Sequence, residues 1–132
     1  MGEINKMQAI FLNVANNQPP EVRQIKDSLQ TFYDLIECNT IDIVHRKIGK
    51  RYFNIVCDDE GALLDRAKIS AISNLGEVRL VGNLVICAGD VTENGDLIGL
   101  TDDQAEYVKQ HIEFLCTRQH PEGYYILTQC EY

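Results

Sequence analysis

The chain has 132 residues, of which 45% are hydrophobic and 24% are charged, a composition typical of one globular domain and not of a disordered chain. Its formal net charge is −8, which disfavours general nucleic-acid binding because a phosphate backbone repels an acidic surface. We see no apolar run long enough to cross a bilayer and no signal peptide. We therefore expect one cytoplasmic domain over residues 1–132.

The first part of the chain predicts two paired strands and a helix. Residues 7–14 are mostly apolar, which indicates a central strand covered on both faces. Residues 21–25 alternate strictly after a turn cluster, so we expect a half-exposed strand that pairs back on the first. An apolar stripe at helical spacing then predicts a helix over residues 27–36, with Asp27 as its N-cap.

Residues 40–61 predict a β-hairpin with a basic turn, around which the rest of the chain is organised. β-Branched and aromatic residues dominate both arms, and Gly49 stands where a short hairpin loop needs a positive φ. The turn, residues 46–51, carries four of the twelve lysines and arginines of an acidic chain. The sequence therefore predicts a sheet protein with a local cationic tip.

The region after the hairpin is less regular. Three carboxylates precede Gly61, which suits an acidic turn better than a metal site. Residues 62–64 fit a helical turn, and residues 68–77 show so little pattern that we expect a long loop that closes over part of the molecule, a kind of loop that is often functional.

Residues 78–87 are the most apolar segment and predict one buried strand. Gly82 within it indicates a bulge or a close backbone approach. Asn83 is a polar residue in an apolar run, so it needs a hydrogen-bonding partner, either local backbone or a ligand. A polar connection with a turn over residues 94–96 follows.

Thr101 has the features of a helix cap, and the spacing after it predicts a helix over residues 101–117. His111 lies beside the apolar stripe of that helix. Residues 124–130 predict a final strand. The chain therefore predicts an α+β fold: a mainly antiparallel sheet of five or six strands, with two helices packed on one face.

The five cysteines do not form a recognisable framework. No two make a C-x-x-C pair, and Cys57 and Cys87 each close a strongly apolar run. We interpret the cysteines as buried reduced thiols and expect no disulfide, no metal and no cofactor.

Four short segments carry a resemblance to a known family. They are Ile41-Asp42-Ile43-Val44, Asp58-Asp59-Glu60-Gly61, Val81-Gly82-Asn83-Leu84-Val85-Ile86 and Leu100-Thr101-Asp102-Asp103. In this order, after the strand pair and helix, they make the chain similar to an uncharacterised domain-of-unknown-function family of bacteriophages, plasmids and conjugative elements. The resemblance covers roughly residues 7–115. It implies a small accessory protein of a phage or mobile element, and it supplies no catalytic residues.

The cationic tip favours binding of a phosphorylated, nucleotide-type ligand. Cations on a turn can donate charge-assisted hydrogen bonds to phosphate, and an adjacent tyrosine can stack on a base. The expected ligand-binding residues are His45, Arg46, Lys47, Lys50, Arg51, Tyr52 and Asn83. A solvated loop tip is the alternative to this interpretation. Sequestering a nucleotide signal of host defence would suit a small non-catalytic phage protein.

Two other functions remain open on the sequence. One is direct inhibition of a host defence protein, through acidic helix starts and an exposed strand edge. The other is a metal-assisted phosphodiesterase using Asp58, Asp59, Glu60 and His111, although adjacent carboxylates on an extended segment point apart. The sequence favours a non-catalytic protein with a small phosphorylated ligand or a host protein as partner. A homodimer formed through strand edges is also expected.

Overall fold

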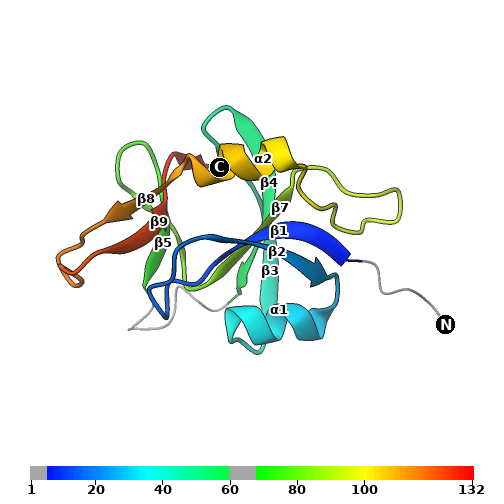
Figure 1. Cartoon of the computed structure of the whole chain (residues 1–132), viewed down its shortest axis with the longest axis horizontal. Coiled ribbons are helices and arrows are strands. Elements are labelled where there is room, and N and C mark those ends of the chain that lie inside the picture. The colour runs from blue at the N-terminus through cyan, green and yellow to red at the C-terminus, as the bar shows by residue number, and fades with distance from the viewer. Residues whose placement is uncertain (1–5, 60–67) are drawn as a thin grey trace.

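The fold is built on a six-stranded sheet in which every neighbouring pair is antiparallel, in the order β10-β3-β4-β7-β1-β2 (Figure 1). This computed structural model describes residues 6–59 and 68–132. The strands of the large sheet are β1 (Lys6–Leu12), β2 (Glu21–Lys26), β3 (Ile41–Ile48), β4 (Arg51–Asp58), β7 (Leu84–Ala88) and β10 (Cys130–Glu131). The prediction of an α+β fold with a mainly antiparallel sheet of five or six strands is confirmed.

A second, smaller sheet has four strands in the order β6-β5-β9-β8. Its strands are β5 (Ile69–Ile72), β6 (Val78–Val81), β8 (Ile112–Leu115) and β9 (Tyr124–Leu127). The pairing of β5 with β9 is parallel, and the other two pairings are antiparallel. The sequence did not predict this sheet, because two of its strands lie in segments that we interpreted as helix and loop.

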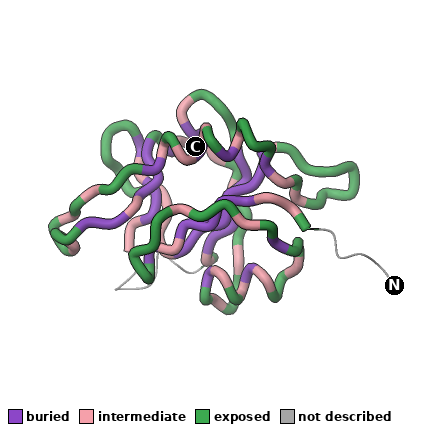
Figure 2. Tube along the Cα trace, in the orientation of Figure 1, coloured by how far each residue is buried: buried purple, intermediate pink, exposed green. Residues whose placement is uncertain are grey.

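The two helices lie on opposite faces of the large sheet, and the expectation that both pack on one face is wrong (Figure 1). Helix α1 (Leu29–Ile36) buries Phe32 and Ile36 against one face. Helix α2 (Asp102–Lys109) buries Ala105 and Val108 in the core on the other face, which the second sheet also lines. The strand residues alternate between these two cores, so the central strands are buried on both sides (Figure 2).

Strand β1 shows how one segment serves both cores. Ile10 and Leu12 enter the core beneath α2, whereas Ala9 and Phe11 enter the core beneath α1. The prediction of a central strand covered on both faces is therefore confirmed, as is its antiparallel pairing with β2.

The apolar segment 78–87 is not one strand. It divides into β6 and β7, which belong to different sheets, and Gly82 at the break has φ 78°. The side chains on both sides are apolar because each strand packs on the shared core, so hydrophobicity alone could not reveal the change of sheet.

Helix α2 begins where the sequence predicted but ends eight residues earlier than expected. The hydroxyl of Thr101 accepts a hydrogen bond from the Gln104 backbone N–H, and the Gln104 side chain accepts from Thr101 N–H, which completes a capping box. The helix ends at Lys109, and β8 follows almost at once. The interpretation of residues 110–117 as helix is wrong, because residues 112–115 form β8, which pairs with β9.

Three smaller expectations also need correction. Residues 124–130 do not form one final strand, because β9 ends at Leu127 in the small sheet and β10 begins at Cys130 in the large sheet. Ser28, and not Asp27, caps α1, since its hydroxyl accepts from the Thr31 backbone N–H. The stretch 68–77 is not a long loop, because it contains β5 and a tight turn before β6. The predicted helical turn at 62–64 lies outside the described residues.

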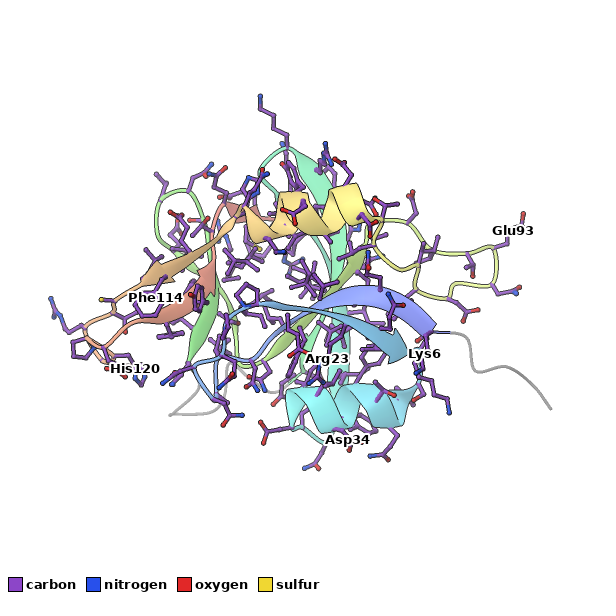
Figure 3. The ribbon with its side chains drawn as sticks, viewed as in Figure 1. Lys6, Arg23, Asp34, Glu93, Phe114 and His120 are labelled. Carbon is purple, nitrogen blue, oxygen red and sulfur yellow. The ribbon has the colours of Figure 1, made fainter. Side chains whose placement is uncertain are left out.

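The connection from β7 to α2 forms the polar turn that the sequence predicted. Val91 and Leu97 form an isolated bridge, and Gly95 at the tip has φ 84°. Figure 3 shows Glu93 projecting from this connection, away from Lys6 and Asp34, so charged side chains spread over several parts of the surface.

All five cysteines are free thiols, and Cys57, Cys87 and Cys130 are buried. Burial raises the pKa of Cys57 and of Cys87 to about 12, and that of Cys130 to about 11. Among the described residues, no helix is long and apolar enough to span a membrane.

Candidate functional site at the central hairpin

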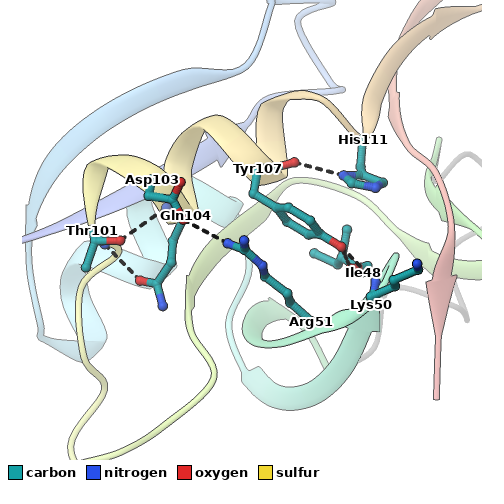
Figure 4. Close-up of polar contacts among 8 residues, drawn as sticks. All are labelled: Ile48, Lys50, Arg51, Thr101, Asp103, Gln104, Tyr107 and His111. Atoms are coloured by element: carbon teal, nitrogen blue, oxygen red, sulfur yellow. Dashed lines mark hydrogen bonds and ion pairs between the residues drawn. The ribbon is translucent and has the colours of Figure 1, made fainter.

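The turn between β3 and β4 is docked on helix α2 by one tyrosine hydroxyl (Figure 4). The Tyr107 hydroxyl accepts a hydrogen bond from the Lys50 backbone N–H at 2.7 Å and donates to the Ile48 carbonyl at 2.9 Å. Gly49 lies between them with φ 61°, and its N–H donates to the Gln129 carbonyl at 3.0 Å. The turn is therefore held in place by α2 and by the segment before β10.

Arg51 is committed to the same helix. Its Nη1 lies 2.9 Å from Oδ2 of Asp103, and its Cζ lies 4.3 Å from the centroid of the Tyr107 ring (Figure 4). Both side chains of the ion pair are substantially exposed, so the pair itself adds little stability. Its geometric effect is to turn this guanidinium away from the other predicted binding residues.

Strand register divides the predicted binding residues between two faces of the hairpin. Arg46 pairs with Phe53, which lies in the core beneath α2, so Arg46 is on the inner face. Lys47 pairs with Tyr52 on the opposite, outer face. The structure therefore does not gather all the cations around one turn.

On the outer face, His45 and Tyr52 form a stacked pair. Their ring centroids are 5.1 Å apart and the planes differ by only 2°. Nδ1 of His45 lies 3.0 Å from Oδ1 of Asn54, a pairing in which the ring N–H donates and the amide oxygen accepts. Tyr52 is 52% exposed and His45 is exposed, so the stack is open to solvent. We call His45, Lys47 and Tyr52, together with Lys50 at the tip, the outer platform.

On the inner face, Arg46 meets two residues that the sequence interpretation missed. The Cζ of Arg46 lies 4.7 Å from the Tyr132 ring centroid, and the Cζ of Arg79 lies 4.4 Å from the same centroid. Register explains the meeting, because β10 pairs with the turn end of β3 and so carries Tyr132 to it. A lone arginine in the apolar segment 78–87 was the only available signal for Arg79.

Asn83 lies at the other end of the hairpin and is fully engaged by the protein. Its Oδ1 accepts from the Ala15 backbone N–H at 3.1 Å, and its Nδ2 donates to the Leu35 carbonyl at 3.1 Å. The second hydrogen of the amide reaches Oε2 of Glu37 at 3.4 Å. Asn83 is 2% exposed, so its observed partners account for the buried amide without a ligand.

The residues considered for metal-assisted hydrolysis are not brought together. His111 lies at the turn, where its Nδ1–H donates to the Tyr107 carbonyl at 2.8 Å. Asp58 ends β4, roughly 23 Å along the strand from Arg51 at the usual rise per residue. Glu60 lies outside the described residues. Within residues 6–59 and 68–132, no group of three or more candidate ligands could hold a metal ion.

The hairpin, the helices on either face of the large sheet and the second sheet define a small α+β domain. The chain belongs to the family described as Domain of unknown function (DUF3846), which matches residues 7–113. The expected membership of an uncharacterised family is thus confirmed. The matched span includes the whole outer platform and Arg79 but not Tyr132. No curated protein and no solved structure matches the chain.

Proposed function

We propose that this protein is a non-catalytic binding protein that holds a phosphorylated, nucleotide-type ligand on the outer platform. The observation that carries the proposal is the parallel, solvent-open stack of His45 and Tyr52, with Lys47 directly across the strand pair from Tyr52. Stacking of a base on an exposed aromatic ring contributes about 1–3 kcal/mol. A ring already fixed by a stacked neighbour loses less conformational entropy when a base arrives.

The lysines supply the phosphate-binding part of the platform. Lys47 lies directly across the strand pair from Tyr52, and Lys50 occupies the tip of the turn. Because the Lys50 backbone is bonded to Tyr107, the root of its side chain is fixed while its ammonium group stays exposed. Each charge-assisted hydrogen bond to phosphate contributes about 1.5–3 kcal/mol.

The biological role that we propose is that of an accessory protein of a phage or other mobile element, which counters host defence by sequestering a nucleotide signal in the cell cytoplasm. Sequestration requires binding and release but no reaction, so a platform of this kind is sufficient for it.

The proposal can be tested by calorimetric titration with four probes, the 5′-monophosphates of adenosine, guanosine, cytidine and uridine. We expect Tyr52→Leu to weaken binding about tenfold or more, and Lys47→Ala to weaken it to a similar degree. Two matched controls are available: Phe114→Leu removes a similarly exposed strand aromatic, and Lys26→Ala removes a strand lysine. If platform and control variants bind alike, the platform is not the site.

A protein partner is the second candidate, and open strand edges favour it. Among the described residues, β2 is the last strand of the large sheet on one side, and on the other β10 pairs with Ile48 and Lys47 of β3. We propose that two copies pair through such an edge to form a homodimer.

Sedimentation at micromolar concentration should give twice the 15.0 kDa mass of one chain. A single 15.0 kDa species would remove the dimer, and a stable complex with a host defence protein would favour direct inhibition.

A further inference from the structure

Arg46 and Arg79 each place a guanidinium group over the ring of Tyr132. In each group the Nε–H lacks a hydrogen-bond acceptor. Nε of Arg46 and Nε of Arg79 are buried and have no hydrogen-bond partner. Their other contacts leave these atoms unused: Arg46 Nη1 donates to the His45 carbonyl at 3.1 Å, and Arg79 Nη2 lies 3.3 Å from Oε2 of Glu131. A buried donor without a partner costs about 1–3 kcal/mol, so two of them in one place favour binding of an acceptor group.

Of the two guanidinium groups beside the Tyr132 ring, only that of Arg79 has a carboxylate within ion-pair distance among the described residues. Glu131 is the carboxylate paired with Arg79, whereas Arg46 forms no ion pair within the described residues. The Arg79 side chain is only 15% exposed. A guanidinium that is largely withdrawn from water interacts with an anion more strongly than a solvated one does.

Both arginines line a pocket of about 280 Å³ between the hairpin and strand β6. Val44, Val78 and Leu80 supply apolar walls, and three carboxylates, those of Asp42, Asp58 and Asp59, also line the pocket. Asp42 and Arg46 are four residues apart on the same face of β3, which separates them by roughly 13 Å. The pocket therefore has one cationic end, an apolar middle and an acidic end.

We infer that this inter-sheet pocket is a second binding site, which takes the single oxyanion of a small ligand at Arg46 and Arg79 and its apolar body along Val44 and Leu80. The acidic end disfavours an extended polyanion, so a monophosphate ester or a carboxylate fits, whereas a polyphosphate chain or a nucleic-acid backbone does not. The site and the outer platform lie on opposite faces of the hairpin, and Glu131, the ion-pair partner of Arg79, is also the cross-strand neighbour of Lys47.

Arginine Nε–H groups can be observed directly by nuclear magnetic resonance, which makes the test specific for the two atoms concerned. The chain has six arginines, and Arg46→Lys and Arg79→Lys identify the two resonances by their loss. Phenyl phosphate, benzoate, inorganic phosphate and tripolyphosphate serve as probes at constant ionic strength. Sodium chloride controls for screening, and Arg118 and Arg23 serve as internal controls.

We expect the Arg46 and Arg79 Nε–H resonances to shift together and to saturate with phenyl phosphate or with benzoate, while those of Arg118 and Arg23 stay in place. Whichever of these two probes binds tighter identifies the ester or the carboxylate as the preferred oxyanion. The aromatic probe should bind about tenfold tighter than inorganic phosphate, because its ring is removed from water. Tripolyphosphate should bind no tighter than inorganic phosphate.

Absence of saturable shifts at Arg46 and Arg79, or equal shifts at all arginines, would overturn the inference. The same holds if tripolyphosphate is the tightest ligand at these two atoms. Arg79→Lys should abolish the shift at Arg46 but leave nucleotide binding by the outer platform unchanged. Failure of the pocket and failure of the proposed function are therefore separate results.

Discussion

The guanidinium of Arg51 lies over the ring of Tyr107, with its Cζ 4.3 Å from the ring centroid, while the hydroxyl of the same tyrosine bridges the turn that precedes Arg51. One helix side chain thus holds the hairpin turn by its hydroxyl and the following arginine by its ring. The cations of the turn are presented from a fixed base, which a freely projecting loop tip would not provide.

The first prediction concerns that hydroxyl. Tyr107→Phe keeps the ring under Arg51 but removes the acceptor for Lys50 N–H and the donor for the Ile48 carbonyl. We expect the free energy of unfolding to fall by about 1–3 kcal/mol, measured by urea denaturation. Tyr33→Phe is the control, because the described residues supply no hydrogen bond to that hydroxyl. Equal stability of the two variants would show that the hydroxyl does not hold the turn.

The second prediction separates backbone strain from steric overlap at Gly49. Gly49 has φ 61°, and a Cβ added there would overlap the Tyr107 hydroxyl and come within 2.7 Å of His111 Nε2. Gly76 has a similar φ of 80° but nothing within 4 Å of an added Cβ. Gly76→Ala should cost about 1–2 kcal/mol from the left-handed conformation alone.

Gly49→Ala should cost clearly more than Gly76→Ala, because the turn must also move off α2. Thermal and urea unfolding of the two variants give the comparison. A Gly49→Ala variant no less stable than Gly76→Ala would mean that the turn is not tightly docked.

The third prediction concerns thiol reactivity. The thiolate is the reactive form, and burial raises the pKa of Cys57 and Cys87 to about 12 and that of Cys130 to about 11. Burial also raises the pKa of the half-buried Cys38, whereas Cys116 is exposed. In native protein we expect Cys116 to react first with a thiol reagent and Cys38 more slowly.

The remaining three thiols should react only on unfolding, which brings the total to five. Cys116→Ser should remove the fast phase and no other. A total of three or one under denaturing, non-reducing conditions would demonstrate a disulfide and contradict the structure.

How far the sequence could predict this fold is shown by the two ends of α2. Thr101 and Gln104 are close in sequence and form a local capping box, so the start of the helix was readable. The C-terminal end of the helix could not be predicted from the sequence, because Ile112 and Leu115 also fit helical spacing. Their strand conformation is set by pairing with Leu127 and Tyr124, which are distant in sequence. Local chemistry was predictable, and non-local pairing was not.

The candidate binding site was also predictable only where its residues are close together in the sequence. The basic residues and Tyr52 could be named because they are contiguous, but their division between two faces depends on strand register. Arg79 and Tyr132 could not be connected with Arg46, because three separate strands carry them to one place. Asn83 was correctly predicted to need partners, and the structure supplies them from the protein.

The fourth prediction concerns acid stability through Glu131. A backbone hydrogen bond from Asn74, which outweighs the effect of burial, and the bond from Arg79 lower the pKa of this carboxyl below its usual range. A lowered folded-state pKa stabilises the protein above the ordinary glutamate pKa of about 4.3, and this contribution disappears as the pH falls through the lowered value. We expect wild type to exceed Glu131→Gln in unfolding free energy at pH 7.

That difference should shrink as the pH falls below about 4. Glu93→Gln is the control, because Glu93 projects from an exposed connection (Figure 3), and its effect should be small at every pH. A difference between wild type and Glu131→Gln that stays constant from pH 7 to pH 3 would contradict the assigned role of the carboxylate.

The most direct test of the central claim is native mass spectrometry of the protein purified from bacterial cells in which defence signalling is active. The account predicts an added mass that matches a phosphorylated nucleotide, present with wild type and with Phe114→Leu, and lost with Tyr52→Leu and Lys47→Ala. Purification of the protein without any bound small molecule, or with an added mass that persists in both platform variants, would contradict it.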